Sequence, residues 1–322
     1  MSSAPGRSTA PPCRLRLPAT SANLGPGFDA VAIALTLYLD VEAAAADAFS
    51  IHATGRNADV CGALEGNLLL DTYRSVLRQQ GSTVVPLSLH VNNGIPLGMG
   101  CGSSAAVILA GVALAAHFGG VPWSREQILA EACAREGHPD NAAACWLGGF
   151  TVAAMEEGRV YAASTLPTQG WKLMLALPQQ PLATKTARSL LPESYTRHDA
   201  IFNVQRVALL TAAFAQGRGD LLRVAMQDRM HQPYRLQVCP LLPRLLPLAG
   251  EEGAQAGILA VALSGAGPAV LLVLQSDAPE DQALQLVEEY AREMDKVELL
   301  MCGIECAAAE FSTSAQPTHE AK

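Results

Sequence analysis

The sequence has few charged side chains and no excess of basic ones. Only 16% of its 322 residues are Asp, Glu, Lys or Arg, and 30 acidic residues against 22 basic ones give a formal net charge of −8. A nucleic-acid-binding surface needs a basic face that neutralises phosphates, so a general nucleic-acid binder is excluded. Half of the residues are hydrophobic, which excludes a disordered chain.

Long apolar runs and ordered cysteine patterns are also missing. The purely apolar segment 105–116 has 12 residues, whereas a membrane-spanning helix needs roughly 18. The first residues lack the apolar core of a secretory signal. The 8 cysteines show neither C-x-x-C spacing nor a zinc pattern with histidines, so they predict no metal site. We expect a compact cytoplasmic protein with reduced thiols, without a membrane or nucleic-acid partner.

The hydrophobic periodicity predicts an α+β protein of two domains. In the first half we expect strands at 14–17, 35–41, 49–53 and 86–92, helices at 66–80, 103–118 and 125–136, a loop at 18–27, and a hairpin over 148–163. In the second half we expect strands at 172–177, 258–263, 269–274 and 297–304, and helices at 184–192, 199–216, 220–231 and 279–294. Without the extra helices this order is β-α-β-β-α-β, typical of a ferredoxin-like domain. The predicted domains are 1–166 and 167–322.

A glycine- and serine-rich loop precedes the most apolar of these helices. It reads Pro-Leu-Gly-Met-Gly-Cys-Gly-Ser-Ser-Ala-Ala over 96–106. At a helix N-terminus the first backbone N–H groups are unpaired and the helix dipole is positive, which favours an anion such as phosphate. Glycine lets the backbone approach the anion closely. The alternative interpretation is an ordinary tight turn with Ser103 as the N-cap.

Two other phosphate-binding loops fit this segment less well. A Walker A loop requires a lysine before its Ser or Thr, and none is present. The spacing of Gly100, Gly102 and Ala105 matches a relaxed dinucleotide-binding fingerprint. However, residues 92–97 separate it from the preceding strand, and no acidic residue ends a second strand at the required distance.

Four segments together resemble the GHMP kinases, which include galactokinase, homoserine kinase and mevalonate kinase. The 96–106 loop is similar to the second motif of the family, residues 18–29 to the first in its homoserine-kinase form, and residues 264–268 to the third. Residues 136–141 (Glu-Gly-His-Pro-Asp-Asn) are similar to a segment typical of homoserine kinases. The resemblance spans about residues 14 to 305.

The resemblance implies a fold, a reaction and partners. The fold is a ribosomal-S5-like N-terminal domain that binds ATP, followed by a ferredoxin-like C-terminal domain. The reaction is Mg²⁺-dependent transfer of the ATP γ-phosphate to the hydroxyl of L-homoserine, in threonine biosynthesis. The alternatives are another small-molecule GHMP kinase, such as a mevalonate-type kinase, and a catalytically silent relative. Relatives are commonly dimers, which makes a homodimer the expected assembly.

The resemblance also assigns residues to the nucleotide and the metal. Ser104 is the implied Mg²⁺ ligand, with Glu131 as its acidic partner and Glu136 as the alternative to Glu131. Asn67 matches a residue near the base or ribose, although helix N-capping explains it equally well. The implied ATP-binding loop comprises Pro96, Leu97, Gly98, Met99, Gly100, Cys101, Gly102, Ser103, Ser104, Ala105 and Ala106. Cys101 departs from the family, which usually has leucine there.

For the acceptor amino acid, the family pattern implies amide and acidic contacts together with two arginines. These contacts are Asn23, Asp29, Asn141, Arg188 and Arg235. Arginine is suited to a carboxylate because it can bind it through two hydrogen bonds.

The proton acceptor is less clear from the sequence. An asparagine cannot take a proton, so Asn141 predicts direct attack of the hydroxyl on the γ-phosphate. Asp140 is the nearest candidate base, and Thr184 is a candidate for positioning the hydroxyl. His138 is expected to be a core or helix-end histidine.

Overall fold

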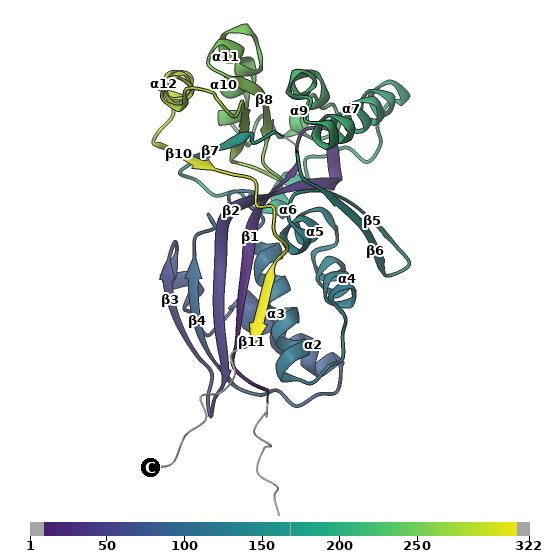
Figure 1. The fold of residues 1–322 in the computed structure, drawn as a ribbon, viewed down its shortest axis with the longest axis vertical. Helices are drawn as coiled ribbons and strands as arrows, with labels where there is room; N and C mark the ends of the chain where they lie inside the picture. The colour runs from purple at the N-terminus through teal and green to yellow at the C-terminus, as the bar shows by residue number, and fades with distance from the viewer. Residues whose placement is uncertain (1–9, 168, 314–322) are drawn as a thin grey trace, which may run out of the picture.

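The structure is a computed structural model that describes residues 10–167 and 169–313. Two sheets lie one above the other along the long axis of the molecule, the larger in the lower half of Figure 1. The larger sheet has seven strands in the order β11-β1-β2-β4-β3, and β5 pairs with both β2 and β6. Its strands are β1 (Cys13–Asn23), β2 (Gly27–Ala45), β3 (Ser50–Gly55), β4 (Leu87–Asn93), β5 (Phe150–Glu156), β6 (Arg159–Thr165) and β11 (Glu310–Thr313).

The predicted loop over 18–27 is wrong, because β1 continues to Asn23 and β2 begins at Gly27. The register of β1 against β2 shifts after Pro18 and again after Ala22, which accommodates the irregular sequence. The small polar residues of β1 are buried and bonded to other segments. Thr20 bonds to Asn141, and Ser21 to Ser264.

Helices cover one face of the larger sheet (Figure 1). They are α1 (Ala58–Cys61), α2 (Leu68–Gln79), α3 (Ser103–Phe118), α4 (Arg125–Glu136) and α5 (Asp140–Leu147). Twelve of the 16 residues of α3 are buried, which confirms a core helix. The capping box of Ser124 and Gln127 begins α4 as predicted. The short helix α5, which the hydrophobic periodicity did not predict, begins within the 136–141 segment.

The smaller sheet has the strand order expected of a ferredoxin-like domain. Its strands β7 (Lys172–Pro178), β8 (Ile258–Leu263), β9 (Val270–Leu274) and β10 (Val297–Cys302) are antiparallel in the order β10-β7-β9-β8. The helices of this half are α6 (Thr184–Arg188), α7 (Arg197–Gln216), α8 (Leu222–Ala225), α9 (Gln232–Arg235), α10 (Leu241–Leu245), α11 (Glu251–Gln255) and α12 (Glu280–Ala291), with 3₁₀ turns η1 (Gly219–Leu221) and η2 (Leu246–Ala249).

The two faces of this sheet belong to different cores, because successive strand residues point to opposite sides. On β7, Met174 faces a core built with α10 and α12, whereas Leu173 and Leu175 face the core shared with the larger sheet. Phe214 of α7 stacks on Phe150 of β5 with ring centroids 4.2 Å apart. Through Phe214, the helix α7 therefore contacts β5 of the larger sheet.

The predicted helix over 220–231 is interrupted after Ala225. The carboxylate of Asp228 accepts hydrogen bonds from the backbone N–H groups of Met230, His231 and Gln232. These bonds replace helical ones, since a side-chain acceptor competes with the backbone for its donors. The chain turns here and then forms the short helix α9.

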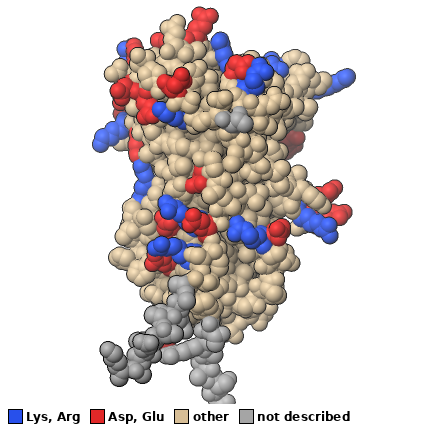
Figure 2. All heavy atoms as spheres, viewed as in Figure 1, with Lys and Arg blue, Asp and Glu red and all other residues tan. Residues whose placement is uncertain are grey.

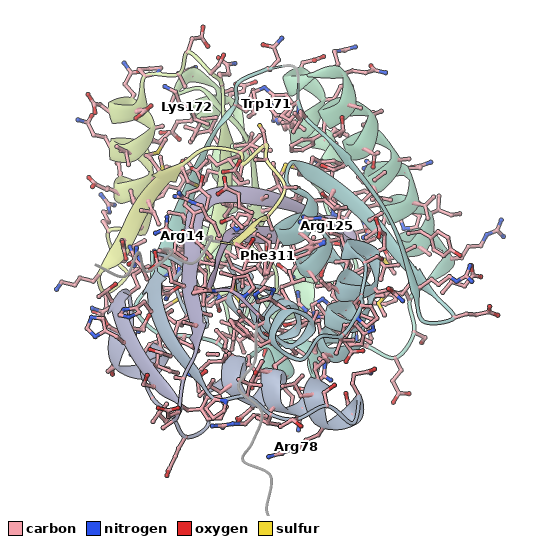
Figure 3. All side chains as sticks on the ribbon, turned by 60° about the horizontal axis from the view of Figure 1, so that its bottom comes forward. Arg14, Arg78, Arg125, Trp171, Lys172 and Phe311 are labelled. Atoms are coloured by element: carbon pink, nitrogen blue, oxygen red, sulfur yellow. The ribbon has the colours of Figure 1, made fainter. Side chains whose placement is uncertain are left out.

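The last described strand, β11, returns to the first sheet and pairs with β1. Arg125 donates to the carbonyl oxygens of Trp146 and Ala309, 3.4 and 3.2 Å away, and so fixes the approach to this strand (Figure 3). The ring of Phe311 packs edge-on against that of His117, with the ring centroids 5.3 Å apart. The predicted domain boundary at residue 166 stays a prediction. The strand β11, which lies near the end of the predicted second domain (167–322), belongs to the larger sheet.

The surface shows no block of one charge on the face drawn in Figure 2, where acidic and basic side chains are interspersed. Among the described helices, none combines the length and the apolar character that crossing a membrane requires.

Candidate active site

The site is assembled where three loops bond to one another. The backbone N–H of Thr20 donates to the carbonyl of Cys101 at 3.1 Å, which joins β1 to the 96–102 loop. The N–H of Gly265 donates to Ala22 at 3.0 Å, and that of Ala269 to Met99 at 3.2 Å. The 264–268 loop of the smaller sheet is therefore bonded to both segments of the larger one.

Two glycines of the 96–102 loop are required by this packing. Gly100 has φ 78°, and a Cβ there would lie 2.1 Å from the carbonyl oxygen of Ser264. Gly102 has φ 69°, and a Cβ would lie 1.9 Å from the Thr20 hydroxyl. The left-handed backbone and the close contacts both favour glycine. The protein's own backbone thus already demands these glycines.

A cavity of about 570 Å³ opens in front of this frame, at the N-terminus of α3. Its lining includes most of the sequence-predicted residues: Asn23, Asp29, Gly98, Gly100, Cys101, Gly102, Ser103, Ser104, Ala105, Asp140, Asn141, Thr184, Arg188 and Arg235. It also includes residues that sequence reasoning missed, namely Phe28, His138 and Lys185. Lys185 lies between Thr184 and Arg188, which were both assigned to the site, and this position in the sequence could have predicted that Lys185 lines the cavity.

One side of the cavity carries acidic groups around a histidine. His138 Nδ1 lies 2.6 Å from Asp140 Oδ1, and ligand atoms of Asp29, His138 and Asp140 all lie within 4.8 Å of one another. Glu136 Oε2 is 3.6 Å from His138 Nε2. His138 follows the end of α4, as expected of a helix-end histidine, and it also lines the cavity. Burial opposes its protonation, but the hydrogen bond to Asp140 raises the pKa of His138 overall.

Glu136 rather than Glu131 faces this cavity. The Glu131 carboxylate accepts from Arg135 at 2.7 Å, one helical turn along α4, and is absent from the cavity lining. The side chain of Glu136 is 10% exposed. Its Oε1 is buried and has no hydrogen-bond partner among the residues that the structure describes. Of the two carboxylates that the sequence offered as metal ligands, Glu136 is therefore the one that lines the cavity.

Two arginines line the cavity next to this acidic cluster. Arg188 binds both carboxylate oxygens of Asp29, at 2.9 and 2.5 Å, and this pairing raises the pKa of Arg188. Arg235 is 1% exposed and has no carboxylate within ion-pair distance in the described chain. Burial, followed by the charge of Arg188, lowers the pKa of Arg235. A buried cation without a counter-ion is costly, and an anion in the cavity would relieve that cost.

The first-motif turn holds its polar residues in unusual backbone conformations. Asn23 has φ 70° and Asp29 has φ 55°, in the left-handed region that non-glycine residues rarely adopt. Asn23 Nδ2 donates to the Gly265 carbonyl at 2.9 Å, and its Oδ1 accepts from the Asp29 N–H at 3.1 Å. Such strain is maintained only where surrounding bonds fix the conformation, and it is common at functional sites.

Several predicted nucleotide residues lie beside the cavity rather than in it. Asn67 caps α2, and its amide also donates to two carbonyl groups, so the side chain is fully occupied. It lines a separate, apolar cavity of about 260 Å³ with Leu97, Ser103 and Ser104. Pro96 and Met99 line a third hollow behind the loop. Ala106 is buried inside α3 and lines neither cavity.

Cys101 is a buried wall residue of the loop. It is 1% exposed, and burial raises the pKa of its thiol to about 12. The thiol is therefore neutral and packs as a small apolar group, which explains how it can stand where the family usually has leucine.

Comparison with known proteins identifies the family. Models described as "GHMP kinases N terminal domain" and "GHMP kinases C terminal" match residues 67–149 and 210–293. A homoserine kinase of Solibacter usitatus is 43% identical over 279 residues, covering 86% of this chain and 90% of that protein. The chain belongs to the GHMP kinase family. A homoserine kinase of Thermus thermophilus is 42% identical over 278 residues, covering 84% of this GHMP kinase and 90% of the relative.

The fold of this GHMP kinase is also found among solved structures. The crystal structure of homoserine kinase from Cytophaga hutchinsonii matches with a TM-score of 0.78 at 21% identity, covering 96% of this chain and all of that one. The two-domain α+β fold expected from the sequence is thereby confirmed.

Replacing Gly102 by alanine tests the role of the loop packing. The new methyl group would collide with Thr20 and disturb its bond to Asn141, so kcat/KM for ATP should fall by about 100-fold or more. Gly120→Ala is the matched control, because Gly120 has φ 64° but open space around its Cβ. The control should lose about 1 kcal/mol of stability and keep its kinetics. Equal losses of activity in both variants would contradict the packing role.

Proposed function

We propose that this GHMP kinase is a homoserine kinase, which transfers the γ-phosphate of ATP to the hydroxyl of L-homoserine in threonine biosynthesis. One observation carries the proposal. A single cavity joins the glycine-rich loop and helix N-terminus to a wall that carries both carboxylates and arginines. Such a wall is complementary to the ammonium and carboxylate of an amino acid, next to a place for its hydroxyl.

The nucleotide fits the loop and the apolar cavity beside it. The N–H groups at the start of α3 and the hydroxyls of Ser103 and Ser104 are oriented to bind the triphosphate. Ser103 and Ser104 line both cavities, so a nucleotide can place its base against Leu68 and Val107 while its phosphates reach the larger cavity. Lys185 offers an additional positive charge on the wall opposite the loop.

The residues present fit a magnesium ion. Ser104 supplies a hydroxyl and Glu136 a buried carboxylate oxygen without another partner, and oxygen ligands of this kind suit Mg²⁺. When bound, the ion neutralises charge that develops on the phosphate oxygens. The protein's own task is to hold the nucleotide and the hydroxyl in line.

The acceptor binds through both signs of charge. Arg235 and the free edge of Arg188 receive its carboxylate, while Asp29 and the amide oxygen of Asn23 are suited to its ammonium. The hydroxyl then lies toward Asn141 and Thr184, which hold it by hydrogen bonds. Because Asn141 cannot accept a proton, the hydroxyl attacks the γ-phosphate directly, and its proton leaves to the phosphate oxygens.

The direct test of the function is ATP consumption with separate acceptors. We expect L-homoserine to stimulate ADP release, with O-phospho-L-homoserine detected by mass spectrometry. Mevalonate, galactose and shikimate should leave the rate at its background, because none of them carries an ammonium group for Asp29. Stimulation by one of these three and not by homoserine would overturn the proposal. Light scattering of the same sample would test the expected homodimer.

The metal assignment is tested by a matched pair of variants on α4. Glu136→Gln removes the proposed ligand, so kcat should fall by about 100-fold or more and the Mg²⁺ dependence should weaken. Glu131→Gln removes only a partly exposed ion pair with Arg135, so activity should stay within about fivefold of the wild type. A larger loss of activity in Glu131→Gln than in Glu136→Gln would instead assign the metal ligand to Glu131.

The absence of a general base is tested at Asp140. Asp140→Asn keeps the size of the side chain and removes its ability to take a proton. A general base contributes about 100-fold or more, so direct attack predicts a loss of kcat below about tenfold. Calorimetric titration with ATP and homoserine serves as the binding control. A loss above 100-fold with both ligands still bound would make Asp140 the base.

A further inference from the structure

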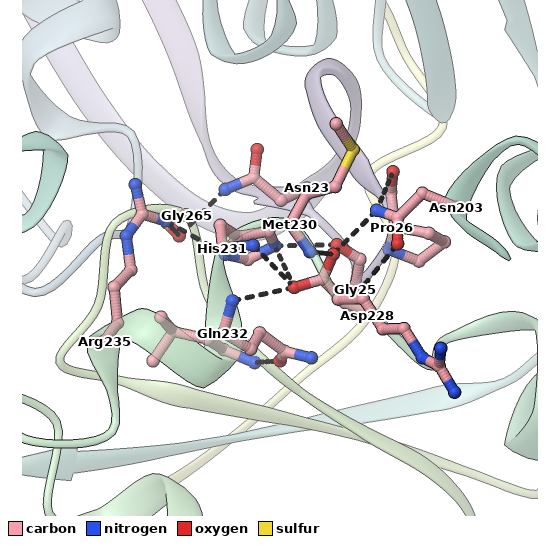
Figure 4. A network of polar contacts seen from close by, with 12 residues as sticks. Asn23, Gly25, Pro26, Asn203, Asp228, Met230, His231, Gln232, Arg235 and Gly265 are labelled. Atoms are coloured by element: carbon pink, nitrogen blue, oxygen red, sulfur yellow. Dashed lines mark hydrogen bonds and ion pairs between the residues drawn. The ribbon is translucent and has the colours of Figure 1, made fainter. Parts of the chain in front are cut away.

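A buried polar network links the first-motif turn to Arg235, and the proposed mechanism does not use its central residue, His231 (Figure 4). The ring of His231 is fully buried. Its Nε2 lies 2.7 Å from the carbonyl oxygen of Gly25, and its Nδ1 lies 3.0 Å from Nη1 of Arg235. The histidine thus stands between the strained turn and the buried arginine.

These two bonds determine the tautomer of the ring. A carbonyl oxygen only accepts, so Nε2 carries the hydrogen that points to Gly25. A guanidinium only donates, so Nδ1 must offer its lone pair to Arg235. Burial lowers the pKa of His231, and the positive charge of Arg235 acts in the same direction, against the opposing effect of Asp228 at 3.6 Å. The neutral ring is therefore the form that fits this position.

The position of His231 is itself fixed from the backbone. The buried Asp228 accepts from the backbone N–H groups of His231 at 2.9 Å and Gln232 at 2.7 Å, which holds the start of α9. It also accepts from Asn203 Nδ2 at 2.7 Å, and the same amide reaches the carbonyl of Pro26 at 3.3 Å. The side chains of His231, Asp228 and Asn203 are all hydrogen-bonded, which is the condition for a rigid buried network.

Arg235 depends on this network for its direction. Its remaining contacts are with two carbonyl groups, Nε to Ala187 at 3.3 Å and Nη1 to Gly265 at 3.2 Å. His231 is its shortest contact, and the ring of Phe28 stacks on His231 at 5.5 Å and lies at the same distance from the guanidinium. Without the acceptor at Nδ1, the guanidinium could rotate about its side-chain torsions within the cavity wall.

We propose that His231 is a positioning residue, which uses the Gly25 carbonyl to select its tautomer and thereby directs Arg235 at the carboxylate of the acceptor. This inference rests on the proposed function, because it assumes an acceptor that carries a carboxylate. It predicts a defect specific to that carboxylate and not to ATP.

Two variants of His231 separate its two bonds. The amide of asparagine coincides with the Nδ1 position, so His231→Asn keeps an acceptor for Arg235. The amide of glutamine coincides with the Nε2 position, so His231→Gln keeps the bond to Gly25 and loses the acceptor. We expect His231→Gln to raise KM for homoserine about tenfold or more, and His231→Asn to stay within about threefold of the wild type. KM for ATP should change in neither.

The inhibition constants of truncated acceptors provide a second measurement. A purely structural role of His231 would not change one of these constants without the other. 4-Hydroxybutyrate keeps the carboxylate and lacks the ammonium, whereas 3-aminopropan-1-ol keeps the ammonium and lacks the carboxylate. In His231→Gln the inhibition constant of 4-hydroxybutyrate should rise about tenfold, and that of 3-aminopropan-1-ol should stay unchanged. In an Arg235→Lys background, His231→Gln should add less than a twofold further loss, because coupled residues are not additive.

The possible outcomes decide between the claims. If the wild type does not phosphorylate homoserine, the proposed function fails. If it does so and His231→Gln keeps its KM, or weakens both inhibitors equally, the positioning role alone is overturned. A full-sized His231→Gln effect in the Arg235→Lys background would overturn it as well. If thermal melting shows that His231→Gln does not fold, His231→Leu, which removes both polar contacts and keeps the bulk, takes its place with the same expectations.

Discussion

The backbone of the 96–102 loop lies so close to that of the 264–268 loop that no side chain fits between them at Gly100, and the site depends on this contact. The glycine-rich loop and α3 belong to the half of the larger sheet, whereas Arg188 and Arg235 end the helices α6 and α9, which lie between β7 and β8 of the smaller sheet in the chain. The Ser264 hydroxyl lies 2.8 Å from the Gly100 carbonyl, which fixes the separation of the two halves. Phosphoryl transfer asks mainly for such positioning, because reacting groups held in line gain most of their advantage from geometry.

Basic side chains line the cavity although the chain as a whole is acidic. The net charge of −8 gives no hint of anion binding, yet Arg235, Arg188 and Lys185 all line the cavity. The pairing with Asp29 fixes the guanidinium of Arg188 and compensates its charge. Arg235 has only neutral hydrogen-bond partners, so its positive charge is uncompensated. In a poorly solvated site an unpaired charge attracts an anion more strongly than in water. An acidic chain can therefore bind highly anionic molecules without a basic surface.

The sequence was sufficient for what local pattern controls and failed where distant contacts decide. The ends of α3 and α4 coincide with the prediction, because apolar periodicity and capping act within a few residues. The 18–27 loop was mispredicted because Thr20 and its polar neighbours in β1 are buried by partners from distant segments. The residues that motif resemblance assigned to the acceptor all line one cavity. The resemblance offered both Glu131 and Glu136 as metal ligands and did not show that only Glu136 lines this cavity, although the spacing of Glu131 and Arg135 by four residues already favoured an ion pair on the helix surface.

The acceptor side of the site is the part most dependent on long-range contacts. Asn23 and Gly265 are 242 positions apart in the chain, and Gly25 and His231 are 206 apart. The phosphate loop leads directly into α3, whose own burial keeps the helix N-terminus in place. The left-handed residues Asn23 and Asp29, in contrast, have no local reason for their conformation, and they hold it because the 226–235 segment and the 264–268 loop over-determine it. The proposed acceptor side thus depends on contacts across the complete fold, whereas the helix N-terminus of the proposed phosphate site is held by the burial of α3 itself.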